Sequence, residues 1–310
     1  VYVAYGQELR FGADPEVSAR ASVLLEELGP ENVKEVRNLD LARAAHAAAT
    51  RSPAARGMLE AMVSTRPNDI DVLSLLGETE LRAREPQAAL AAWEKAEVVE
   101  KSARTAYGLA RAKFLAGDRK QAEELATLTL TRNPSHVGAR ILTARATWNH
   151  GKEAQATKLL EEVTADTAGS SSGELVEAHT LLGEVHLARS RVTHAEKAFS
   201  EALKIDPKSA RALVGLGDAL YRAGRYSEAL ARFEAAAQSD AREVTARVGV
   251  AKTALALERL EDAATAIEKL KGEFPKSVLV AYWGCKVQEA AGSRKEAEAA
   301  YRQVIAAGVV

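Results

Sequence analysis

Histidine and cysteine are the residues of this sequence best suited to metal binding or nucleophilic chemistry. His179 and His186 are seven residues apart, so a helix would place both rings on one face, where they could share a metal ion. Both also stand where a repeated helical pattern places packing aromatic residues, and we interpret them as packing residues. Since no His-Glu-x-x-His arrangement occurs, the sequence predicts no metal site.

Nucleophilic and phosphate-binding motifs are equally scarce. Cys285 is the single cysteine, so no disulfide can form within the chain. It stands where the pattern places small residues, and we interpret it as a packed thiol rather than a nucleophile. The Gly215-x-Gly217 pair follows a helical pattern instead of a strand, which argues against a phosphate-binding loop. The sequence therefore predicts no enzyme and no cofactor.

The elements that position these residues recur along the chain. The recurring residues are Leu182-Gly183, Ala195, Phe199 and Ala202, followed 34 residues later by Leu216-Gly217, Ala229, Phe233 and Ala236. A fixed period of this size predicts stacked helical units instead of one globular core. Extending the period gives eight units, 36–69, 70–102, 103–136, 137–175, 176–209, 210–243, 244–277 and 278–310. Residues 1–35 are interpreted as a degenerate N-terminal repeat or cap.

Each unit contains two amphipathic helical patterns with recognisable ends. Glycine at the fifteenth place predicts a helix end with a left-handed residue. These glycines are Gly117, Gly151, Gly224 and Gly292. Asn133-Pro134 and Asp206-Pro207 are interpreted as an N-cap followed by proline at the first helical position. Small residues at the eighth and twentieth places and a bulky residue at the twenty-fourth predict close packing between the two helices.

This pattern resembles the tetratricopeptide repeat family. The resemblance implies an all-α fold, a right-handed α-solenoid superhelix of stacked antiparallel helix pairs. It also implies a non-enzymatic protein-interaction module. In that family the first helix of each unit lines a concave groove, with places 2, 5, 9, 12 and 13 facing the ligand.

Mapping those places onto this sequence singles out a stretch rich in arginine and aromatic residues. The candidate binding residues are Arg104, Tyr107, Arg111, Phe114, Arg145, Trp148, Asn149 and Tyr221. Guanidinium groups suit carboxylates and aromatic faces suit apolar groups, so one hypothesis is an acidic peptide with apolar anchors. The alternative is that the arginines pair within the protein with Glu78, Glu80 or Glu184, while the aromatic residues fill the wall.

Bulk composition narrows the partners and the compartment. Net charge is −1 and 27% of the residues are charged, so nothing global favours nucleic acid or an anionic membrane. No apolar run reaches the length of a membrane span, so direct membrane insertion is not expected. We expect a soluble protein, cytoplasmic or in a bacterial periplasm. Both ends of the sequence look like cuts within a longer protein or the result of removing a leader.

The sequence is compatible with three functions. The first is a scaffold or adaptor in a bacterial multiprotein assembly, such as an envelope, pilus, secretion or polysaccharide export machine. The second is the regulatory or substrate-recruiting segment of a larger enzyme, for example a kinase or transferase. The third is self-association through the C-terminal repeat, because the sequence ends on Val309-Val310 without a polar capping helix.

Overall fold

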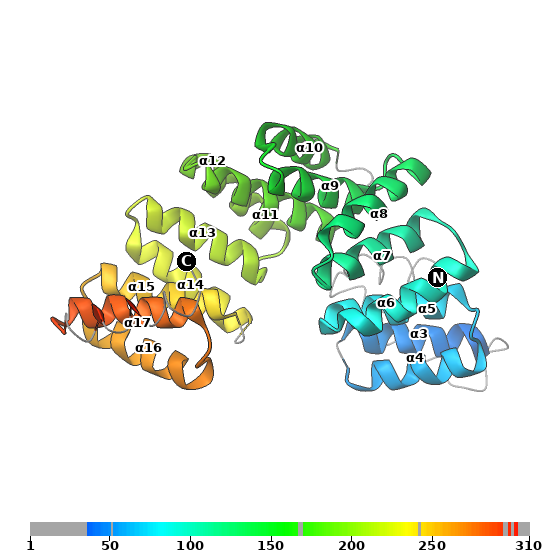
Figure 1. Ribbon diagram of the computed structural model, residues 1–310, viewed down its shortest axis with the longest axis horizontal. Helices are drawn as coiled ribbons and strands as arrows, with labels where there is room; N and C mark the ends of the chain where they lie inside the picture. Colours follow the sequence, from blue (N-terminus) through cyan, green and yellow to red (C-terminus); the bar gives the residue numbers. More distant parts are fainter. Residues whose placement is uncertain are drawn as a thin grey trace. The chain divides into compact units, whose positions relative to one another are not determined.

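Helices make up all the regular structure in the residues that the computed structural model describes, 36–50, 52–166, 170–240, 243–293, 297–298 and 301–302 (Figure 1). The helices are α3 (Val36–Ala49), α4 (Ala54–Thr65), α5 (Ile70–Ala83), α6 (Pro86–Val99), α7 (Ala103–Leu115), α8 (Arg119–Arg132), α9 (Val137–Asn149), α10 (Glu153–Ala165), α11 (Ser172–Ala188), α12 (Val192–Ile205), α13 (Ala210–Arg222), α14 (Tyr226–Ser239), α15 (Val244–Ala256), α16 (Leu260–Glu273) and α17 (Val278–Ala290). The all-α fold expected from the sequence is confirmed. The cap expected over 1–35 lies outside the described residues, and the boundaries of the eight repeats stay a prediction.

The chain divides into two compact units, Val1–Leu175 and Val176–Val310. Within each unit, helices that follow one another pack together, as α5 does with α6 and α13 does with α14 (Figure 1). The first helices of successive pairs also touch, since α5 contacts both α3 and α7, and α15 contacts both α13 and α17. The first helices α3, α5 and α7 of the first unit, and α13, α15 and α17 of the second, therefore form a layer of neighbouring helices within their own unit.

Left-handed residues end the first helix of a pair, as predicted. Four of them are glycines, with φ of 87° at Gly117, 75° at Gly151, 76° at Gly224 and 81° at Gly292. At the same place in other repeats the chain forces this conformation on Arg84 (φ 62°), Ser190 (φ 56°) and Glu258 (φ 61°). A Cβ atom makes this region unfavourable by roughly 1–2 kcal/mol.

Glycine at these forced positions is expected to stabilise the protein. Glu258→Gly should raise the free energy of unfolding by about 1 kcal/mol, because glycine adopts positive φ without a steric penalty. The matched variant Glu258→Ala keeps the Cβ atom and should show no such gain. Urea unfolding followed by circular dichroism distinguishes the two, and equal stability of the two variants would contradict the explanation.

The N-caps predicted at Asn133 and Asp206 are wrong. These residues follow the ends of α8 and α12, and the N-cap positions of the next helices lie three residues later, at His136 and Ser209; of these two, only His136 makes a side-chain capping bond. The Asn133 Oδ1 atom accepts a hydrogen bond from the Ser135 amide at 3.2 Å, and Asp206 accepts one from the second amide after it at 3.0 Å. Side chains of this type stabilise tight turns in the same way as caps. Asn-Pro and Asp-Pro therefore mark the turn between repeats.

Three large buried rings of the core each lie against one glycine of the preceding helix and one of the following helix. A Cβ atom on Gly217 of α13 would lie 2.8 Å from Cε1 of Phe233, and one on Gly249 of α15 would lie 2.6 Å from the same atom. Phe199 lies in the same way between two glycines, and so does Trp93. Their glycine partners are Gly183 and Gly215 for Phe199, and Gly77 and Gly108 for Trp93. The predicted small-against-large packing is thus confirmed, with a second glycine from the next repeat.

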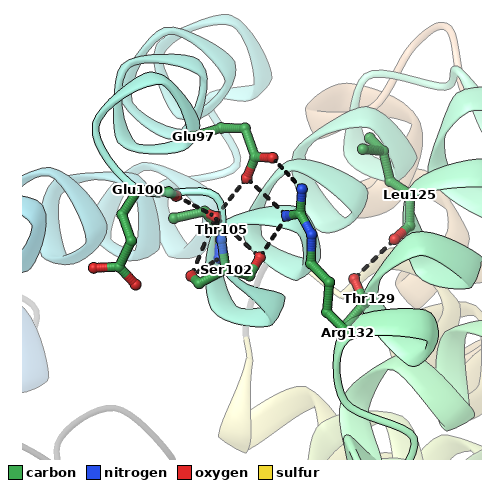
Figure 2. A network of polar contacts seen from close by, with 7 residues as sticks. All are labelled: Glu97, Glu100, Ser102, Thr105, Leu125, Thr129 and Arg132. Carbon is green, nitrogen blue, oxygen red and sulfur yellow. Dashed lines mark hydrogen bonds and ion pairs between the residues drawn. The ribbon is translucent and has the colours of Figure 1, made fainter.

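A polar network joins three helices of the first unit (Figure 2). The Arg132 guanidinium, at the end of α8, donates to Oε1 of Glu97 in α6 at 2.8 Å and to the carbonyl of Ser102 at 2.7 Å. Ser102 and Thr105 form a capping box at the start of α7, and the Thr105 hydroxyl also contacts the Glu97 carboxylate. Because Arg132 reaches both the end of α6 and the start of α7, it fixes where α7 begins.

Candidate functional site

Seven of the eight candidate residues lie on α7 and α9 in the first unit. Arg104, Tyr107, Arg111 and Phe114 follow one another along α7 at spacings of three and four, so they share one face. Arg145, Trp148 and Asn149 lie on α9. All seven are half-buried except Asn149, which is exposed. We call these seven residues the α7–α9 surface.

Two arginines of this surface pair with carboxylates of α5. The Nη1 atom of Arg111 donates to both carboxylate oxygens of Glu78, at 2.6 and 2.7 Å. Arg104 donates to Oδ1 of Asp71 at 3.1 Å. Each pair links residues 33 apart, so the two couples join equivalent places in neighbouring repeats. Ion pairing within the protein, the alternative left open by the sequence, thus applies to Arg104 and Arg111.

Aromatic rings join α7 to α9. The guanidinium of Arg145 lies over the ring of Phe114, 5.8 Å from its centroid. On α7, Arg111 lies over Tyr107 at 5.6 Å. The Tyr107 ring is packed so closely on Gly138 that no side chain would fit there. Stacked guanidinium groups hold their planar edge in a fixed direction, which suits them to recognise carboxylates beside apolar side chains.

Tyr221 is not part of this surface, because it belongs to α13 in the second unit. Its ring lies 5.2 Å from that of Tyr226, and Nζ of Lys252 lies 4.6 Å from its centroid. Lys252 is itself paired with Asp218. Burial raises the pKa of the Tyr221 hydroxyl. Tyr221 therefore contributes to a separate cluster within its own unit.

His179, His186 and Cys285 occupy partly or fully buried positions on helices. His186 is buried in α11 and its ring lies 5.4 Å from that of His194. Burial lowers the pKa of His179 on the same helix. Cys285 is buried in α17, and burial raises the pKa of its thiol, which disfavours the reactive thiolate. Within the described part of the chain, no group of three or more acidic, histidine or cysteine side chains could hold a metal ion.

Sequence reasoning named Glu78 correctly but assigned two other partners of the surface wrongly and missed a third. It proposed Glu80 for an arginine of the surface, but Glu80 pairs with Arg56 of α4. It did not name Asp71 as a partner of Arg104, although the two residues stand about one repeat apart and this separation could have indicated the pair. Glu184 pairs with Arg211 in the second unit.

The helices described here include none with the length and apolar character needed to cross a bilayer.

Comparison with known families supports the reading of the repeats. A family model described as tetratricopeptide repeat matches residues 148–210 and 214–278. A search of curated proteins gave no match.

Solved structures with the same fold have low sequence identity. The Cut9-Hcn1 hetero-tetramer of the APC/C aligns with a TM-score of 0.75 and 14% identity, covering 94% of this chain and 56% of that chain. This chain thus spans little more than half of that protein. PilW, described as a type IV pilus biogenesis factor, aligns at 0.57 and 17% identity, covering 68% and 96% of the two chains. A monomeric IFIT1 variant with Gppp-AAAA aligns at 0.67 and 17% identity, covering 94% and 73%. These likenesses concern the fold alone.

Proposed function

The chain belongs to the tetratricopeptide repeat family, whose members generally mediate protein–protein interactions, and we propose that it binds an extended segment of a partner protein on the α7–α9 surface. The observation that carries this proposal is the pair of arginine–aromatic stacks, Arg111 over Tyr107 and Arg145 over Phe114. They place charge and apolar area side by side on neighbouring helices. The proposed role is non-catalytic.

The partner segment that suits this surface carries acidic residues beside large apolar ones. Guanidinium groups supply the donors for carboxylates, while half-buried Trp148 and Phe114 supply apolar area. A ligand carboxylate must compete with Glu78 for Arg111, because the Nη1 atom of Arg111 already donates to both Glu78 carboxylate oxygens. A ligand must therefore bind strongly enough to displace the carboxylates of α5. A single weak acidic contact would not do so.

We propose that this scaffold serves a bacterial multiprotein assembly. An alanine- and arginine-rich repeat sequence supports the bacterial origin. A type IV pilus biogenesis factor among the structural neighbours supports an envelope machine, with a cytoplasmic or periplasmic location. Two alternatives stay open, a regulatory segment of a larger enzyme and a self-assembling scaffold. The reading frame around this sequence would test the first, and light scattering would test the second.

Peptides selected from a displayed random library test the proposed surface. We expect the selected peptides to combine acidic and large apolar residues. Arg111→Ala combined with Arg145→Ala should weaken their binding by about tenfold or more, as the loss of central arginine contacts does at interfaces. Fluorescence anisotropy with labelled synthetic peptides gives the affinities, and unchanged affinity in the double variant would exclude this surface.

Two further variants make the test specific. Arg119→Ala with Arg259→Ala removes the same charge from exposed positions of α8 and of the turn before α16, and should leave affinity unchanged. Glu78→Gln weakens the internal competitor of Arg111 and should increase affinity for acidic peptides. Thermal melts check that all variants remain folded. Preferential binding of a single-stranded RNA oligonucleotide, with no peptide selected, would contradict a protein partner.

A further inference from the structure

One titratable ring lies at the junction of the α7–α9 surface. His136 is the N-cap of α9, and its Nδ1 atom accepts a hydrogen bond from the Ala139 amide at 3.3 Å. The ring is half-buried. Nitrogen can accept this bond only while it carries no proton, because a protonated imidazole has donors at both nitrogens. The cap therefore requires neutral His136.

The same ring supports Tyr107. The centroids of the His136 and Tyr107 rings are 4.5 Å apart, and Tyr107 also contacts Gly138 and the Arg111 guanidinium. Arg111 in turn is held by Glu78. A connected series of contacts thus runs from α5 through α7 to the first turn of α9, and His136 is the member that titrates near neutral pH.

Charged groups around His136 act in opposite directions. Arg111 of α7, which stacks on Tyr107, would repel a positive imidazolium, although its pairing with Glu78 of α5 weakens that effect. Glu174, in the first turn of α11, would attract the imidazolium. That carboxylate is also engaged, since it accepts a hydrogen bond from the Ser171 hydroxyl at 2.8 Å.

We propose that His136 is a proton-sensitive cap: proton uptake at Nδ1 breaks the bond from the Ala139 amide, loosens the first turn of α9 and displaces the ring of Tyr107. Protonation thereby weakens the α7–α9 surface in mildly acidic solution. The consequence for ligand binding rests on the proposed function, whereas the change in α9 itself does not.

The direction of the pH effect follows from burial. Burial lowers the pKa of His136 below its ordinary value of 6.5, so the folded protein favours the neutral ring more than the unfolded chain does. Stability from this group is complete above that value and is lost as pH falls through the folded pKa. His179 of α11, whose pKa burial also lowers, adds a similar loss. Removing His136 should therefore reduce the acid sensitivity without abolishing it.

Replacement by asparagine separates the cap from its titration. His136→Asn keeps a side-chain acceptor that is favoured at N-caps and does not titrate. Between pH 7.5 and 5.5, the urea midpoint of the wild type should fall further than that of His136→Asn. The difference should correspond to about a fivefold change in the unfolding equilibrium, as expected for one capping bond. His150→Asn, at the exposed end of α9, should retain the acid sensitivity of the wild type.

Nuclear magnetic resonance of the wild-type chain gives an independent test. The Ala139 amide and the Tyr107 ring should shift with the same pH midpoint as the His136 imidazole. An Ala139 amide that does not follow His136, or equal acid sensitivity of the wild type and His136→Asn, would overturn the proposal. Neither readout uses a ligand, so failure of peptide binding would overturn the proposed function alone.

Discussion

Replacing Gly249 with alanine is expected to lower the free energy of unfolding by roughly 2–3 kcal/mol, the cost of overfilling a packed core. Gly249 lies in α15, and an added Cβ atom would stand 2.6 Å from Cε1 of Phe233, whose side chain is fully buried. Gly217 of α13 also packs against the same ring, so Phe233 has little room to move when a Cβ atom is added at Gly249. Urea unfolding followed by circular dichroism measures the loss.

A glycine outside the core provides the matched control. Gly272 lies in the last turn of α16, and an added Cβ atom would meet nothing within 4 Å. Gly272→Ala should therefore stabilise the protein, by up to about 1 kcal/mol, because alanine favours a helix more than glycine does. If Gly249→Ala proved as well tolerated as Gly272→Ala, the proposed confinement of Phe233 would be wrong.

A double variant tests whether the cost arises from this contact. Phe233→Leu shortens the side chain that faces Gly249, at the cost of some buried area. In that background Gly249→Ala should cost at least about 1 kcal/mol less than in the wild type, since residues in contact do not act additively. Strict additivity of the two substitutions would show that the loss in Gly249→Ala has another origin.

The repeat pattern predicted the contacts of these rings within their own helix pair. It identified Phe199 and Phe233 as large residues that each face a small residue of the same pair, because the large and the small residue stand in one short stretch of sequence. It did not identify Gly215 and Gly249, which approach the same rings from the following repeat. Contacts between repeats depend on how helix pairs stack, and an amphipathic pattern within one pair does not determine that arrangement.

The α7–α9 surface shows a similar limit. The ligand-facing places implied by the family resemblance were enough to put Tyr107 and Phe114 on one face. They were not enough to show that Arg104 pairs with Asp71, because a long side chain can reach several neighbours and only the packed structure selects one. The position of Asn133 was ambiguous for a different reason. Asparagine before proline suits both an N-cap and a turn, and the link between α8 and α9 required the turn.

Arg56→Ala is expected to destabilise the first unit by about 2–3 kcal/mol, because it leaves a buried carboxylate without its partner. Glu80 of α5 is only 2% exposed, and Nε of Arg56 in α4 donates to its Oε1 atom at 2.6 Å. A second guanidinium nitrogen contacts the other carboxylate oxygen. The effect should be smaller than for a fully buried pair, since Arg56 is itself about half exposed and water can partly replace it. Thermal and urea unfolding measure the loss.

The double variant Arg56→Ala with Glu80→Leu distinguishes a stranded charge from lost packing. It removes the carboxylate together with its partner, so most of the stability should return, as happens when buried ion pairs are replaced by apolar residues. Arg225→Ala removes an arginine that is about as exposed as Arg56 and equally well bonded, but its partners Glu196 and Glu228 are not buried, so it should change the urea midpoint little. If Arg56→Ala behaved like Arg225→Ala, burial of Glu80 would not govern the energetics of this pair. If the double variant stayed as unstable as the single one, the Arg56 side chain would stabilise α4 and α5 by packing rather than by charge.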